Sequence, residues 1–198
     1  MKWTLERIEK ETNHRFLNFY TYHYQVEKDG KLEPYPYFVA SRREGDKLEA
    51  LSKKRKPDGV LVAVLTEEED PSILLINVFR PPLNDYVVEF PAGLVSEEDE
   101  GPLETARRET EEETGFLLRE LHLLCPPSPT SSGLSDELVA VVEGKIDAQG
   151  KRALEEFEDI NYRFVKLSKV KKYFDACGHL VALNVRLAVE ILLERYHG

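Results

Sequence analysis

The spacing of hydrophobic residues along this chain predicts several short strands before the first long helix. Residues 15–26, RFLNFYTYHYQV, are aromatic and alternate roughly, and residues 32–42 form a second candidate strand whose prolines favour a sheet edge. Residues 27–30, EKDG, predict the turn between them. Residues 59–65, GVLVAVL, are apolar throughout, as expected for a strand that is buried on both faces. Residues 3–11, by contrast, predict a short helix.

The rest of the chain mixes strands with helices. Further strands are expected at 72–79, 86–90, 119–125, 136–143 and 161–167, and helices at 102–114, 169–176 and 181–196. Pro102 suits a first helical turn, Gly115 suits a left-handed stop, and Ser168 is a candidate cap for the following helix. The last helix offers one broad apolar face, made of Leu183, Val185, Leu187, Ala188, Ile191 and Leu192.

Strands and helices follow one another without a strict βαβ rhythm. The fold class expected is therefore α/β (α+β), with a mixed sheet between helices. Residues 1–57 are expected to form a small N-terminal β subdomain, and residues 58–198 the main domain.

Composition narrows the class of protein. With 41% hydrophobic and 32% charged residues the chain is globular, and no apolar run reaches the ~18 residues of a membrane span. The N-terminus is amphipathic and acidic, unlike a signal peptide, and there are only two cysteines, Cys125 and Cys177, so a cytoplasmic location is expected. The net charge of −10 argues against a broad nucleic-acid surface.

Carboxylates crowd the helix expected at 102–114. Glu109, Glu112 and Glu113 stand at positions i, i+3 and i+4, so they share one helical face, whereas Glu111 lies on another. Converging carboxylates repel one another unless a cation lies among them. Hard oxygen ligands favour Mg²⁺, which leaves room for substrate phosphates.

The residues around this helix follow a longer pattern. Gly93 is followed by six residues, Glu100, seven residues and then RETEEETGF from Arg108 to Phe116. This pattern resembles the signature of the Nudix hydrolases, with one extra residue before Glu100 and Thr110 in place of an aliphatic residue. The extra residue lies before the helix, so the spacing of the helix carboxylates is kept. The resemblance implies a Nudix α/β/α sandwich with a mixed sheet.

Two flanking segments are similar to the ADP-ribose and ADP-sugar pyrophosphatase branch of that family. They are VFRPP at 78–82 continuing to EFPAGL at 89–94, and SPT at 128–130 with GLSDE at 133–137. The branch carries a proline downstream of the signature. Pro129 is the best candidate, with Pro126 and Pro127 as alternatives.

The resemblance implies roles for individual residues. Glu109 and Glu113 would be the principal Mg²⁺ ligands, with Mn²⁺ as a substitute metal, while Glu112 assists and the Ala92 carbonyl completes the metal shell. Arg108 would orient the helix carboxylates, and Glu100 would support either Arg108 or a metal-bound water.

A later element of the branch, Glu-x-Glu-Asp-Ile, reads EFEDI at 156–160 in this chain. By position Glu156 would be the general base and Glu158 a further metal ligand. Because Glu155 precedes them, a register shifted by one residue stays open. An acidic loop facing solvent is the plainer interpretation of these residues.

The resemblance also implies a set of substrate-binding residues. Arg80 and Arg42 would contact phosphates, Phe16 and Tyr37 would stack on the base, and Pro129 would line the site. In relatives the aromatic residues come from two subunits, which implies a homodimer with exchanged N-terminal subdomains. Sheet packing for the two aromatics and pairing with a surface carboxylate for Arg42 are the alternatives.

The function implied is Mg²⁺-dependent hydrolysis of the diphosphate of a nucleoside diphosphate sugar. ADP-ribose, cleaved to AMP and ribose 5-phosphate, is the first expectation. UDP-sugars or NADH-type dinucleotides are alternative substrates. A non-catalytic nucleotide sensor on the same fold is a third hypothesis, but such a protein generally loses signature carboxylates that this chain keeps.

Overall fold

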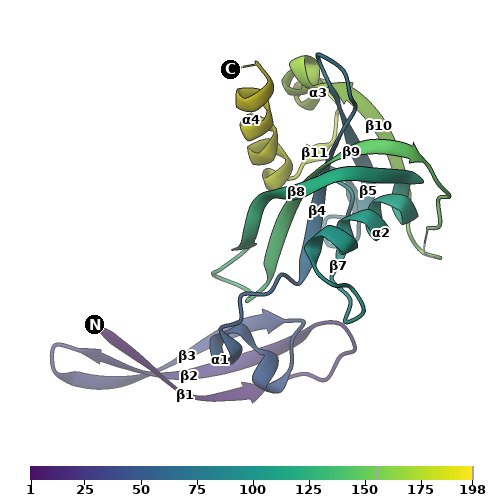
Figure 1. The fold of residues 1–198 in the computed structure, drawn as a ribbon. Coiled ribbons are helices and arrows are strands. Elements are labelled where there is room, and N and C mark those ends of the chain that lie inside the picture. The colour runs from purple at the N-terminus through teal and green to yellow at the C-terminus, as the bar shows by residue number, and fades with distance from the viewer. Residues whose placement is uncertain (155, 198) are drawn as a thin grey trace. The chain divides into compact units, whose positions relative to one another are not determined.

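A computed structural model describes residues 1–154 and 156–197 of the chain. Contacts divide the chain into two compact units, coloured along the chain in Figure 1. Unit 1 comprises Met1–Pro57 and Pro127–Leu138, and unit 2 comprises Asp58–Pro126 and Val139–Gly198. Residues 127–138 lie within the main domain expected from sequence, whereas their contacts place them in unit 1. None of the described helices is long and apolar enough to span a membrane.

Unit 1 is built on a three-stranded antiparallel sheet in the order β1 (Lys2–Lys10), β2 (Asn18–Lys28) and β3 (Lys31–Ser41). The helix predicted at 3–11 is therefore wrong. Leu5 and Ile8 have the i, i+3 spacing of a helix, but a register shift between Leu5 and Arg7 interrupts the strand's alternation. Both side chains thus pack against the same aromatic cluster around Tyr22.

Short segments complete unit 1. The turn Asp29-Gly30 has positive φ at both residues, 52° and 74°, as a tight two-residue hairpin requires. A 3₁₀ turn (Gly45–Lys47) and α1 (Glu49–Ser52), neither predicted from sequence, follow β3. The segment 127–138 is bonded to β3, since the Ala40 N–H donates to the Leu134 carbonyl at 2.9 Å.

Unit 2 contains a mixed sheet in the order β11-β6-β5-β4-β9-β8, with β10 beside β5 and β7 beside β4. The β4–β9 and β6–β11 pairs are parallel. The strands are β4 (Gly59–Leu65), β5 (Ser72–Arg80), β6 (Asp85–Glu89), β7 (Ala92–Leu94), β8 (Phe116–Pro129), β9 (Leu138–Gln149), β10 (Ile160–Lys166) and β11 (Leu180–Val181). The helices are α2 (Pro102–Thr114), α3 (Val170–Ala176), preceded by a 3₁₀ turn (Leu167–Lys169), and α4 (Leu183–His197).

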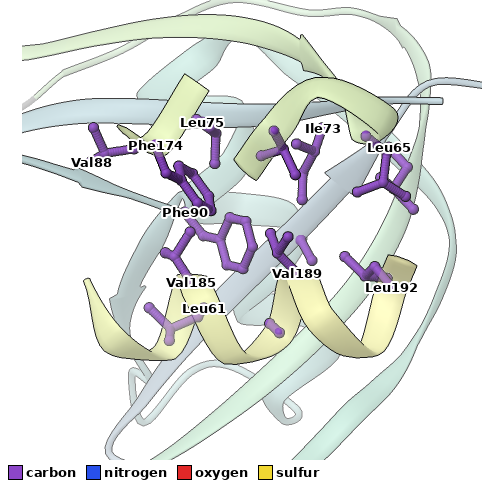
Figure 2. Packing of buried hydrophobic residues seen from close by; sticks show 14 residues of the cluster. Leu61, Leu65, Ile73, Leu75, Val88, Phe90, Phe174, Val185, Val189 and Leu192 are labelled. Carbon is purple, nitrogen blue, oxygen red and sulfur yellow. The ribbon is translucent and has the colours of Figure 1, made fainter. Parts of the chain in front are cut away.

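The core of unit 2 lies on both faces of its sheet, and β4 is buried along its whole length, as predicted. Its odd-numbered residues from Leu61 pack with α3 and α4, as Figure 2 shows around Phe90. Its even-numbered residues from Val60 pack with Ala106 of α2. The sheet is thus sandwiched between helices, which confirms the predicted fold class.

Two details of the helices differ from the sequence prediction. On α4 the buried face consists of Val185, Ala188, Val189 and Leu192, whereas Leu183, Leu187 and Ile191 are exposed. Only one side of its apolar surface is therefore buried. Ser168 does not cap α3, because its hydroxyl donates to Asp70 instead.

Candidate active site

Helix α2 begins and ends where the sequence predicted. Pro102 occupies its first turn, and Gly115 ends it in the left-handed conformation at φ 80°. Both residues suit these positions, because proline needs no helical N–H partner and glycine has no Cβ to clash. The acidic face of the helix turns toward the sheet, with Glu113 only 5% exposed and Glu109 and Glu112 half-buried.

Strand β7 packs closely against this acidic face. The Ala92 N–H donates to Glu113 Oε2 at 3.1 Å. A Cβ added to Gly93 would lie 1.8 Å from Glu109 Cδ and 2.0 Å from its Oε1. Gly93 is therefore required for space: it lets the backbone approach a carboxylate that an alanine would displace.

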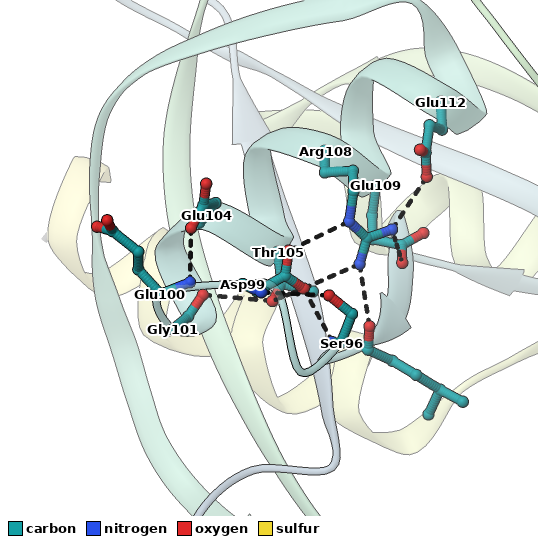
Figure 3. A network of polar contacts seen from close by, with 10 residues as sticks. Ser96, Asp99, Glu100, Gly101, Glu104, Thr105, Arg108, Glu109 and Glu112 are labelled. Atoms are coloured by element: carbon teal, nitrogen blue, oxygen red, sulfur yellow. Dashed lines mark hydrogen bonds and ion pairs between the residues drawn. The ribbon is translucent and has the colours of Figure 1, made fainter.

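Arg108 is the centre of a polar network that holds the acidic face (Figure 3). Its Nη1 donates to Glu109 Oε1 at 2.7 Å and to Glu112 Oε2 at 3.1 Å. Its Nη2 donates to the Leu94 carbonyl at 3.1 Å and to Asp99 Oδ2 at 3.0 Å. Arg108 thus contacts two carboxylates of α2 and the backbone of β7, which is consistent with the orienting role predicted for it.

The acidic partner of Arg108 in the loop before α2 is Asp99 rather than Glu100. Asp99 also accepts from the Ser96 N–H and the Thr105 hydroxyl. Glu100 is exposed, and its N–H donates to Glu104 Oε2 at 2.6 Å. Of the two roles expected for Glu100, support of Arg108 is therefore taken by Asp99 in this structure. The extra residue in the loop explains the change, because the family's spacing counted forward from Gly93 reaches position 99.

Burial and mutual repulsion perturb these carboxyl groups. The pKa of Glu113 is raised to about 8, chiefly by burial; the charges of Glu109 and Glu158 add to this shift, and the Ala92 hydrogen bond and the charge of Arg80 oppose it. Burial likewise raises the pKa of Glu109, while Arg108 opposes the shift. The Arg108 guanidinium holds the pKa of Asp99 well below its usual range. A cluster with raised carboxyl pKa values is short of positive charge.

Arg80 lies at the end of β5 and forms a two-point ion pair with Glu89. Its Nε and Nη2 donate to the two Glu89 oxygens at 2.8 and 2.6 Å, which leaves Nη1 outside this pair. The hydrogen bonds that Arg80 donates to Glu89 are the largest cause of its raised pKa, and the charges of Glu113 and Glu158 add to this. Arg80 is thus a fixed cation beside the acidic cluster.

The two loop carboxylates lie in different surroundings. Glu156 is exposed in a turn, whereas Glu158 is half-buried. The charge of Glu158 contributes to the raised pKa values of Glu109, Glu113 and Arg80. Glu158 therefore belongs electrostatically to the cluster on α2. Glu155, which created the ambiguity of register, lies outside the described residues.

The remaining candidate residues all belong to unit 1. Phe16 is 65% exposed, with the Arg15 guanidinium 4.8 Å from its ring centroid. Arg42 pairs with Glu137 at 3.6 Å. Tyr37 donates its hydroxyl to the Gly133 carbonyl at 2.8 Å, and Tyr37 and Pro129 line one cavity of about 490 Å³. The candidate residues thus form two groups, a substrate-binding group in unit 1 and the acidic group with Arg80 in unit 2.

The donor set of the acidic group fits a hard divalent cation. Glu109, Glu112, Glu113 and Glu158 offer only carboxylate oxygens, and the raised pKa values of Glu109 and Glu113 favour an added positive charge. Within residues 1–154 and 156–197 no three such side chains are already arranged as a metal site. Arg108 instead engages oxygens of Glu109 and Glu112.

Sequence reasoning missed two residues of the site, Asp99 and Glu89. Asp99 could have been found by counting forward from Gly93 as well as backward from Arg108. Glu89 gave no such signal, since its contact with Arg80 joins two different strands and follows no local periodicity.

Comparison with known proteins gives consistent matches. The NUDIX domain family matches residues 55–180. The chain is 37% identical over 117 residues to an ADP-ribose pyrophosphatase of Bacillus subtilis (strain 168), covering 58% of this chain and 62% of the relative. It is 33% identical over 121 residues to a methanol dehydrogenase activator of Bacillus methanolicus, covering 60% and 63%.

Two further matches extend this comparison. An ADP-sugar pyrophosphatase of Mus musculus is 32% identical over 91 residues, covering 46% of this chain and 38% of the relative. The chain thus spans less than two thirds of the length of each of these relatives. A solved structure described as an ADP compounds hydrolase superposes with a TM-score of 0.68 at 17% identity, covering 100% of this chain and 97% of the other.

Proposed function

Since the chain belongs to the NUDIX domain family, we propose that it hydrolyses the diphosphate bond of nucleoside diphosphate sugars. ADP-ribose is the first substrate, Mg²⁺ the metal, and AMP and ribose 5-phosphate the products. The observation that carries this proposal is the cluster of Glu109, Glu113 and Glu158 beside the fixed cation Arg80. Relatives named ADP-ribose and ADP-sugar pyrophosphatases support the choice of substrate.

The chain's own residues account for the binding of a diphosphate. Glu109, Glu112, Glu113 and the Ala92 carbonyl on unit 2 would hold the metal, with Glu158 from the loop before β10. When bound, the metal neutralises diphosphate charge and polarises the attacked phosphorus. Arg80, oriented by Glu89, offers Nη1 to a phosphate oxygen. Arg108 holds Glu109 and Glu112 in place.

A carboxylate must also accept the proton of the attacking water, a contribution worth about 10²–10⁴-fold in rate. The resemblance assigns this role to Glu156 and a ligand role to Glu158. Of the two residues, Glu158 has the better support, because its charge reaches Glu109 and Glu113 while Glu156 is exposed. We therefore propose Glu158 as the loop carboxylate on which turnover depends.

The residues of unit 1 complete the proposal. Phe16 and Tyr37 would stack on the base, Arg42 would contact phosphate, and Pro129 would line the base site, with each site shared across a cytoplasmic homodimer. The cavity beside Tyr37 and Pro129 supports a planar ligand, because Trp3, Tyr22 and Tyr24 also line it.

The activity is tested by incubating the purified protein with Mg²⁺ and ADP-ribose and separating the products by chromatography. AMP and ribose 5-phosphate in equal amounts are expected. ADP-glucose, UDP-glucose and NADH form the comparison panel. Preferred cleavage of UDP-glucose or NADH would change the substrate, and binding without cleavage of any panel member would refute the hydrolase.

The loop assignment is tested by a matched pair of variants. Glu158→Gln is expected to lower kcat by about 10²-fold or more, whereas Glu156→Gln stays within about threefold of the wild type. Both changes remove one charge from the same loop, so the net charge is controlled. If Glu156→Gln lowers kcat more than Glu158→Gln does, Glu156 is the loop carboxylate on which turnover depends.

A further inference from the structure

Residues 149–153, the end of β9 and the chain that follows it, lie against the C-terminal end of α2. The Gly150 N–H donates to the Gly115 carbonyl at 2.6 Å, and the Ala153 N–H donates to the Glu112 carbonyl at 2.8 Å. A helix leaves its last carbonyls without intrahelical partners. The chain entering the Glu158 loop thus supplies donors to the end of the helix that carries Glu109, Glu112 and Glu113.

Glycine makes this close approach possible. A Cβ on Gly150 would lie 2.8 Å from Glu111 Oε1, and one on Gly115 would lie 2.8 Å from Gln149 Nε2. Gln149 Nε2 itself donates to the Gly115 carbonyl at 3.0 Å. The end of α2 and residues 149–153 are therefore joined by backbone hydrogen bonds and by close side-chain contacts.

Arg152 joins both ends of the loop. Its Nε donates to the Glu113 carbonyl at 2.6 Å, and its Nη2 donates to the Ile160 carbonyl at the start of β10. The same guanidinium lies 5.8 Å from the ring centroid of Tyr162. One side chain therefore spans the segment 153–159, which carries Glu156 and Glu158, and ties it to the backbone of a proposed metal ligand.

The far end of the loop is held separately. The Phe79 N–H of β5 donates to the Asp159 carbonyl at 3.3 Å, and the Tyr86 hydroxyl of β6 donates to the Asp159 carboxylate. Asp159 is thus anchored to the sheet, while Ala153 and Arg152 are anchored to α2. Glu158 directly precedes Asp159, so it is next in sequence to the residue that is bonded to the sheet.

From this geometry we infer that Arg152 is a positioning residue, which sets Glu158 against the carboxylates of α2. The inference rests on the proposed function and deepens it. Among the described residues, Arg152 donates to two backbone carbonyls, those of Glu113 and Ile160, and not to a proposed ligand oxygen. Its loss should leave the fold of unit 2 intact and misplace Glu158.

Arg152→Ala is expected to lower kcat at least tenfold with KM changed less than threefold, while Arg152→Lys recovers part of the loss. The matched control is Arg107→Ala. Arg107 also donates from α2 to a backbone carbonyl, that of Leu118, but does not join the loop. The double variant Arg152→Ala/Glu158→Gln should be no slower than Glu158→Gln alone, because Arg152 acts through the Glu158 carboxylate and has nothing left to position once that group is neutral.

Two measurements do not depend on turnover. Mn²⁺ binding, followed by its paramagnetic resonance signal, should weaken at least fivefold in Arg152→Ala and stay unchanged in Arg107→Ala. Amide exchange at Ala153 should quicken in Arg152→Ala while exchange in β4 stays slow, which shows that the core is intact.

Outcomes separate the inference from the proposed function. If the wild type cleaves no diphosphate, the hydrolase proposal fails, and Mn²⁺ affinity and amide exchange still judge the role of Arg152. Strictly additive losses in the double variant, or wild-type kcat and Mn²⁺ affinity in Arg152→Ala, would overturn the inference.

Discussion

The closest contact in the candidate site predicts the effect of Gly93→Ala. The new Cβ would lie 1.8 Å from Glu109 Cδ, 2.0 Å from Oε1 and 2.3 Å from Oε2. Ordinary carbon contacts need about 3.5 Å, so the carboxyl group must move by roughly 1.5 Å or more. That movement breaks the 2.7 Å hydrogen bond from Arg108 Nη1 to Glu109 Oε1.

The cost in stability should be small. A hydrogen bond to a charged group is worth about 1.5–3 kcal/mol, but the Arg108 side chain is 33% exposed and keeps its bonds to Asp99. Alanine also restricts the unfolded chain, which stabilises the protein by about 0.4–1 kcal/mol. The net change in the free energy of unfolding is therefore expected within about 1 kcal/mol. Turnover, by contrast, should fall about 10²-fold, roughly 2.7 kcal/mol in activation free energy.

A double-mutant cycle isolates the cause. Once Glu109→Ala has removed the carboxyl group, the three atoms nearest to the new Cβ are gone. Gly93→Ala should then have no further effect on kcat with ADP-ribose, and Glu109→Ala should alone reproduce the loss. Urea denaturation of the wild type, the two single variants and the double variant measures the change in the free energy of unfolding. If Gly93→Ala lowers kcat equally in both backgrounds, the steric reasoning is refuted.

Three further predictions follow from the same region. Asp99→Asn should lower kcat about tenfold, because it removes the charged partner of Arg108. The control Glu100→Gln should leave kcat within about twofold of the wild type. Equal effects of the two variants would contradict the pairing of Arg108 with Asp99. For Glu113 the folded pKa of about 8 lies above the unfolded value of about 4.3, so between these values the folded state keeps a proton that the unfolded state releases, and the stability from this group falls as pH rises. Metal-free protein should therefore lose on the order of a few kcal/mol of unfolding free energy from this group between pH 4.5 and 8, and Glu113→Gln should flatten that slope in denaturation curves. Gly115→Ala should cost on the order of 2 kcal/mol in the same assay, because φ is 80° and its Cβ would lie 3.2 Å from the Arg152 backbone nitrogen; an unchanged midpoint would contradict the strain.

Local periodicity allowed the sequence to determine much of unit 2. A strand that is apolar at every position is stable inside a sheet that is covered on both faces, and β4 is buried in this way. Helix α2 was determined just as firmly, since its starting proline, its final glycine and the i, i+3, i+4 spacing of its glutamates are all short-range features. The family signature depends on this same spacing.

Short-range spacing misled where one residue altered the phase of a pattern. In β1 a register shift between Leu5 and Arg7 turned an apparent helical spacing into one face of a strand. In the loop before α2 one extra residue moved the partner of Arg108 from Glu100 to Asp99. Periodicity assumes an unbroken count, and a bulge or an insertion breaks the count without changing the composition.

What the tertiary structure alone decided was which charges meet. The pairing of Arg80 with Glu89 joins neighbouring strands, and Arg152 joins the end of α2 to the start of β10. The sequence supplied the glutamates as a list and, by helical geometry, a common face for three of them. Only the folded chain couples Glu158 to the acidic face of α2, because electrostatic coupling depends on distance through space. The loop that carries Glu158 is held by backbone contacts, and these follow no sequence pattern.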